Sequence, residues 1–235
     1  MKLNNTKSIE QIVTLTTPTD IEKADFKLDE NYMVALTPGN AAKALKCIQE
    51  NTHYQNPSYE QYYHERNKKL RDYSRDELEN LLWCVARSNS TRSSNKNISI
   101  MADWVFKNLT QFLNRLEKGD ATLVDELTTI NGLSRKEKSL SSKICAYLCV
   151  LEFGQSKFAI NDAVVRRMLP YYLKYYDISA QSKALEKCSY CEIVALIDRI
   201  VEKLPEKIAY SGIDQIIWYC YKDDPVRTEL ALALS

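Results

Sequence analysis

The sequence predicts a mostly α-helical protein. Glycine is scarce, at 5 of 235 residues, and the 6 prolines are scattered, which disfavours a turn-rich β fold. Apolar residues recur at helical spacing over most of the chain after residue 76. Residues 12–15 and 32–36 are the candidates for a few short N-terminal strands, and they could equally be irregular packing segments.

Composition limits the classes of protein that the chain can belong to. With 45% hydrophobic and 27% charged residues, a chain of this length can bury a real core. The net charge of +1 means that a nucleic-acid surface would have to be local. We find no signal peptide and no apolar run long enough to span a bilayer, so we expect a cytoplasmic protein without a membrane partner.

The core is expected to begin at a capping box. Ser74 and Glu77 have the spacing of this motif, and apolar residues follow at helical spacing until the polar loop at 86–95. A long helix over 98–118 should end at Gly119. We therefore expect an N-terminal segment, 1–75, packed on a core of 76–235. A helix should start near residue 41, and others are predicted at 122–130, 136–152, 162–175, 180–187, 190–203 and 211–222.

Two local features have an ordinary interpretation and a functional one. Residues 54–73 combine tyrosines with basic side chains, which can hold nucleic acid, but the solvated face of an amphipathic helix is favoured. Cys188 and Cys191 form a CxxC pair without a second pair. Reduced structural thiols are favoured there over a zinc or redox site.

One lysine and one aspartate suggest chemistry. Lys143 and Asp162 are 19 residues apart (162 − 143), enough for a helix, a connection and the start of a second helix. A lysine is a nucleophile only as the free amine, and apolar surroundings favour that form. A carboxylate at a helix start can cap the helix and stabilise positive charge on a reacting sugar. Alone, these residues fit equally a surface lysine and a helix cap.

Further segments, in order along the chain, complete a recognisable set. Residues 82–90, Leu-Trp-Cys-Val-Ala-Arg-Ser-Asn-Ser, contain a Ser-Asn pair at a helix end, and residues 129–133 form a turn containing Gly132. Gln215 and Tyr219 follow Gly212 as Gly-x-x-Gln-x-x-x-Tyr. Together with Lys143 and Asp162, these segments resemble the 8-oxoguanine DNA glycosylase branch of the helix-hairpin-helix superfamily, over roughly residues 76–222.

The resemblance implies a helix-hairpin-helix glycosylase-like fold and a bifunctional DNA glycosylase/lyase acting on an oxidised or otherwise modified purine in double-stranded DNA. Lys143 would attack C1′ and form a Schiff base, with Asp162 supporting the transition state. Gln215 and Tyr219 would hold the flipped base, and Asn89 would fill the gap that the base leaves. No cofactor or catalytic metal is implied.

The chain also departs from this family. The hairpin has Gly132 alone where the family has two glycines, and residues 134–139 lengthen the turn. Tyr147 stands where the family has a cysteine beside the lesion, and Val164 replaces a histidine. The N-terminal β domain is shortened or missing. Phosphate contacts would then come from basic side chains flanking Lys143, namely Arg87, Arg92, Arg135, Lys136, Lys138 and Arg166.

The alternative is a non-catalytic helical module that uses the same pocket to bind a modified base, a nucleotide or a protein. Shortened relatives of the family occur in bacterial antiphage defence operons, which implies a protein partner from such an operon. The near-neutral charge and the altered hairpin favour this alternative, whereas the presence of both Lys143 and Asp162 favours the enzyme.

Overall fold

The computed structural model describes residues 25–50, 58–88, 91–179 and 185–235. Within these ranges the chain is mostly helical and contains no sheet, as the sequence predicts. Residues 32–36 form no strand, and only an isolated bridge joins Val34 to Leu28. Residues 12–15 lie outside the described residues. None of the described helices is both long enough and apolar enough to cross a membrane.

The observed helices follow the expected order, and most boundaries agree within a few residues. The capping box at Ser74 and Glu77 forms in both directions, with N···O distances of 2.8 and 3.3 Å. The helices are α3 (Pro38–Glu50), α4 (Ser58–Arg66), α5 (Arg75–Ser88), α6 (Asn95–Lys107), α7 (Leu109–Lys118), α8 (Thr122–Thr128), α9 (Lys138–Phe153), α10 (Ala163–Tyr175), α11 (Tyr190–Lys203), α12 (Tyr210–Tyr221) and α13 (Pro225–Leu234), with short 3₁₀ turns at Leu70–Asp72 and Leu185–Lys187.

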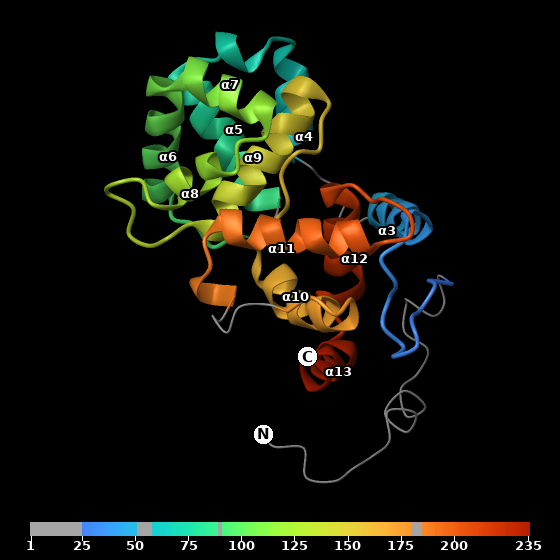
Figure 1. Ribbon diagram of the computed structural model, residues 1–235. Helices are drawn as coiled ribbons and strands as arrows, with labels where there is room; N and C mark the ends of the chain where they lie inside the picture. Colours follow the sequence, from blue (N-terminus) through green and yellow to red (C-terminus); the bar gives the residue numbers. More distant parts are fainter. Residues whose placement is uncertain (1–24, 51–57, 89–90, 180–184) are drawn as a thin grey trace.

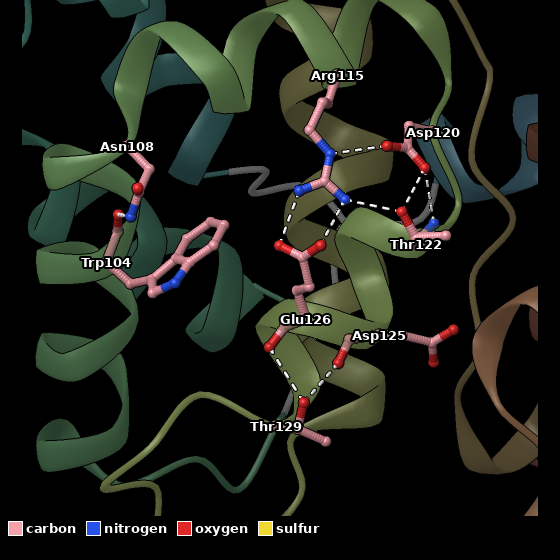
Figure 2. Close-up of polar contacts among 8 residues, drawn as sticks. All are labelled: Trp104, Asn108, Arg115, Asp120, Thr122, Asp125, Glu126 and Thr129. Carbon is pink, nitrogen blue, oxygen red and sulfur yellow. Dashed lines mark hydrogen bonds and ion pairs between the residues drawn. The ribbon is translucent and has the colours of Figure 1, made fainter.

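The single helix expected over 98–118 is wrong, because Asn108 divides it into α6 and α7. The Asn108 side-chain amide donates to the Trp104 carbonyl at 2.8 Å, as Figure 2 shows. Asparagine competes for backbone hydrogen bonds in this way and is therefore a poor interior helix residue. The periodicity of the apolar residues continues across the break, so it could not reveal the interruption.

The helices bury two apolar cores (Figure 1). The first cluster consists of α4 to α9, and its core includes Leu81, Leu82 and Leu140, all fully buried. The second cluster consists of α3 and α10 to α13, and its core includes Tyr172 and Ile216. Residues from the N-terminal third of the chain contribute to both, since α3 joins the second cluster and α4 the first.

The close approach of α3 to α12 depends on Gly212. A Cβ atom at this position would lie 2.8 Å from Ile208 Cγ1 and 3.1 Å from Ala41 Cβ. Distances this short are not tolerated between carbon atoms in a close-packed interior. The glycine in the Gly-x-x-Gln element thus has a packing role that is independent of any ligand.

A polar clamp links α7, α8 and α11 (Figure 2). Arg115 of α7 bonds the carboxylates of Asp120 and Glu126, each at 2.7 Å. Asp125, the neighbour of Glu126 on α8, points the other way and accepts the Tyr190 backbone N–H at 2.7 Å. This carboxylate therefore caps the start of α11 and ties the second cluster to the first.

The connection between α9 and α10 runs back along α9. The ten residues from Lys143 to Phe153 rise about 15 Å, and Gly154 ends the helix with φ of 67°. Apolar Phe158 and Ile160 are buried in the return segment. The Asn161 N–H donates to Ser142 Oγ at 3.0 Å, which holds the start of α10 beside the residue that precedes Lys143.

The loop between α8 and α9 is held by a buried polar network. Asn97 of α6 accepts the Ser134 N–H at 3.0 Å and donates to Glu137 at 2.7 Å. Glu137 also accepts from Ser93 at 2.8 Å and from Arg135 at 3.0 Å. Both Asn97 and Glu137 are almost fully buried, so the loss of either would leave polar groups without partners.

Replacement of Asn97 by alanine should therefore destabilise the protein by about 2–4 kcal/mol, since it leaves a buried carboxylate and a loop N–H unsatisfied. Urea unfolding monitored by circular dichroism measures the change. Lys96→Ala, on the exposed side of the same helical turn, is the control and should be close to neutral. Equal stability of the two variants would contradict a structural role for the network.

Candidate active site between the two helical clusters

The structure brings Lys143 and Asp162 together at the boundary of the two clusters. Lys143 Nζ lies 3.4 Å from Asp162 Oδ2. The lysine is 3% exposed and the aspartate 7%. One residue belongs to α9 of the first cluster and the other precedes α10 of the second. The short distance follows from the buried return segment, which reverses the chain over the length of α9.

The two oxygens of Asp162 have different partners. Oδ1 accepts the backbone N–H groups of Val164 and Val165, each at 3.0 Å, so that Asp162 is the N-cap of α10. Oδ2 faces the Lys143 amine. The cap fixes the orientation of the carboxylate, and the helix N-terminus favours its negative charge. Asp162 can therefore present a charge in a defined direction without rearrangement.

A second carboxylate, which sequence reasoning missed, acts on this pair. Asp214 of α12 has a buried Oδ1 without a hydrogen-bond partner among the described residues. Desolvation raises the pKa of Asp214 to about 7; the charge of Asp162 adds to the increase and that of Lys143 opposes it. A carboxylate in the apolar helix 210–221 was a usable signal, but attention went to its neighbour, Gln215.

Two stacked tyrosines adjoin the carboxylates. Tyr147 lies one turn after Lys143 on α9, and its ring stacks on Tyr59 of α4 with centroids 4.6 Å apart and an interplanar angle of 15°. Burial, and next the charge of Asp214, raises the pKa of Tyr147. Burial raises that of Tyr59, to which Asp214 also contributes. Tyr59 is the second residue that sequence reasoning did not assign to the site.

The remaining base-binding candidates lie on α12. Gln215 is half-buried and follows Asp214 directly. Tyr219 stacks on Phe26, with ring centroids 6.0 Å apart, and packs against the second core. Its stacking partner in this structure is therefore a residue of the N-terminal segment. Trp218, four residues after Asp214, carries the Lys222 ammonium 4.2 Å from the centre of its ring.

Several of the predicted basic residues form a connected series beside the hairpin loop. Arg92, Arg135 and Lys136 are exposed, and Arg135 donates to the Arg92 carbonyl at 2.6 Å. Burial lowers the pKa of Lys138, and the nearby charges of Arg166 and Lys136 lower it further. The series thus extends from the loop to the start of α10.

Arg166 ends this series next to the candidate pair. Its guanidinium donates to the backbone carbonyl of Asn161 at 2.6 Å and to the Asn161 side chain at 3.0 Å. Burial lowers its pKa, and the charge of Asp162 opposes that change. Arg87 is on α5, with its guanidinium 3.7 Å from the centre of the Trp83 ring. Exposed Gly132 has φ of 95°, and Asn89 lies outside the described residues.

The cysteines are all free thiols. Cys188 is buried, and Cys191 is half-buried beside Asp125. Burial, and next the hydrogen bond to Asp125, raises the pKa of Cys191 to about 11, which makes it a poor nucleophile at neutral pH. Across residues 25–50, 58–88, 91–179 and 185–235, no group of three or more His, Cys, Asp or Glu side chains could hold a metal ion.

Comparison of the chain with protein-family models, with curated proteins and with solved structures finds no match. The interpretation of the site therefore depends on its own geometry and chemistry.

Replacement of Lys143 by methionine should destabilise the fold by about 3–5 kcal/mol at pH 7.5, because it leaves the buried Asp162 charge without its counterion. Urea unfolding measures the loss. Lys107→Met, at an exposed position of α6, is the matched control. Asp162→Asn should cost less, since asparagine also caps helices. A loss below about 1 kcal/mol for Lys143→Met would contradict a buried ion pair.

Asp214 should make stability depend on pH. Its pKa is about 7 in the folded protein and 3.8 as the reference value, so the folded state binds the proton more tightly between these pH values. Stability should therefore be greatest at low pH and decrease as pH rises towards 7. Between about pH 5 and 8 the wild-type protein should lose roughly 2–3 kcal/mol relative to Asp214→Asn. Parallel urea titrations would contradict this if the difference stayed constant.

Proposed function

We propose that this protein is a DNA glycosylase with AP lyase activity that removes an oxidised or otherwise modified purine, such as 8-oxoguanine, from double-stranded DNA. The proposal rests on one observation, the buried approach of Lys143 Nζ to within 3.4 Å of Asp162 Oδ2. An amine nucleophile and a fixed carboxylate are the two groups that this chemistry needs beside the sugar.

The reaction would begin when the target nucleotide is extruded from the duplex. The Lys143 amine attacks C1′, and the bond from C1′ to the base breaks. The resulting Schiff base undergoes β-elimination, which cuts the strand on the 3′ side. Asp162, whose orientation is set by the N-cap bonds to α10, stabilises the positive charge that develops on the sugar.

The other assigned residues hold the DNA and the base. Gln215, Tyr219 and Tyr147 are proposed to surround the extruded purine, with Tyr59 as a further aromatic neighbour because it stacks on Tyr147. Asn89 is proposed to enter the gap in the duplex. Backbone contacts are assigned to the α8–α9 hairpin at Gly132 and to the basic side chains of Arg87, Arg92, Arg135, Lys136, Lys138 and Arg166.

Borohydride trapping on duplexes that carry either 8-oxoguanine or an abasic site tests the nucleophile. The wild-type protein should form a covalent adduct with at least one duplex, because borohydride reduces the Schiff base to a stable amine. Lys143→Gln should abolish the adduct. Lys107→Gln, which changes an exposed lysine on α6, is the matched control and should react like the wild-type protein.

The two duplexes separate the chemistry from the choice of base. An adduct with the abasic duplex alone would keep the lysine chemistry and direct the search to another modified base. No adduct with either duplex, from protein shown by circular dichroism to be folded, would overturn the proposal.

A non-catalytic binding module is the second candidate, and it would fit a protein partner in an antiphage defence system. It is favoured by the burial of the lysine in an ion pair, since an ammonium paired with a carboxylate cannot attack carbon. Tight binding to the abasic duplex in fluorescence anisotropy, unchanged by Lys143→Gln and without any adduct, would favour this module.

A further inference from the structure

We propose that Asp214 is the proton-transfer group of this site: it accepts a proton from Lys143 Nζ and returns that proton to the departing base. This inference rests on the proposed glycosylase reaction and adds a catalytic residue to it. The need for such a group follows from the resting structure, in which the lysine is paired with Asp162 and must lose a proton before it can attack.

The charged groups around Asp214 are those of the proposed reaction. Asp214 comes from α12, and the two charges that act on it are Asp162 at the start of α10 and Lys143 on α9. Asp214 acts in turn on Tyr147 of α9 and on Tyr59 of α4. The aspartate is therefore directed towards the boundary between the clusters.

The buried Oδ1 of Asp214 lacks a hydrogen-bond partner among the residues that the structure describes. A buried polar atom in this state costs free energy. The cost is understandable if the atom serves a reacting group instead of the fold.

Asp162 is less suited to this transfer. Its Oδ1 accepts two backbone N–H groups of α10, and a proton there would break the cap. When two carboxylates share a site in different environments, the desolvated one carries the proton and the hydrogen-bonded one keeps its charge. The pKa of Asp214, raised to about 7 mainly by desolvation, allows both uptake and release of a proton near neutral pH.

The transfer balances in two steps. The Lys143 ammonium gives one proton to the Asp214 carboxylate, which leaves a neutral amine and a carboxylic acid. The amine then forms its bond to C1′ while the bond from C1′ to the base breaks and the base takes the electron pair. The Asp214 acid protonates the base and becomes a carboxylate again. On an abasic aldehyde, the carbonyl oxygen takes this proton instead.

The test measures trapping rates on an abasic duplex with cyanoborohydride, from about pH 5.5 to 8.5. The wild-type rate should rise with pH through an inflection near 7, where Asp214 becomes able to accept a proton. Asp214→Asn should lose this inflection and react about 100-fold more slowly. Asp214→Glu should recover part of the rate with a displaced inflection. Asp162→Asn should react slowly but keep the inflection.

The possible outcomes distinguish this inference from the proposed function. If the wild-type protein forms an adduct and Asp214→Asn keeps both the rate and the inflection, Asp214 is not the proton-transfer group, although the lysine chemistry stands. If Asp214→Asn is slow but keeps the inflection, its role is structural and the inference fails. If the wild-type protein forms no adduct, the proposed function and this inference both fail. Circular dichroism checks that each variant is folded.

Discussion

The reversal of the chain between α9 and α10 is the constraint on which the rest of the site depends. Phe158 and Ile160 bury this connection, and Asn161 is bonded to Ser142. Since the connection runs antiparallel to α9, the end of one cluster's helix and the start of the other's are brought to the same level. The ion pair of Lys143 with Asp162 is a consequence of this path, as is the contact between the two clusters at that point.

The electrostatic balance of the site is uneven. Two carboxylates, Asp162 and Asp214, act with one ammonium, Lys143, in a region with little water. Full ionisation would leave one excess negative charge buried, which is costly. Protonation of Asp214 relieves that cost, so the state of this residue follows the pH and the charge of whatever occupies the boundary. A substrate that develops positive charge would favour the ionised state.

Local patterns predicted most of the fold, whereas features set by long-range packing escaped them. The capping box at Ser74 and the start of α10 at Asp162 could be identified because they depend on neighbouring residues. The division at Asn108 could not, because apolar periodicity continues across it. The closeness of Lys143 and Asp162 was predictable from their spacing. Asp214 and Tyr59 reach the site only through the packing of α12 and α4 against α9, which no local pattern reports.

The missing side chain at Gly212 has a consequence for how such a site can diversify. With a Cβ there, α12 would have to withdraw from α3, and Asp214, two residues further along, would move with it. The glycine therefore acts as a depth stop that keeps the backbone of α12 in one position. Substitutions at Gln215, Trp218 and Tyr219 could then alter which ligand is accepted, while the distance between the acid and the amine is inherited unchanged.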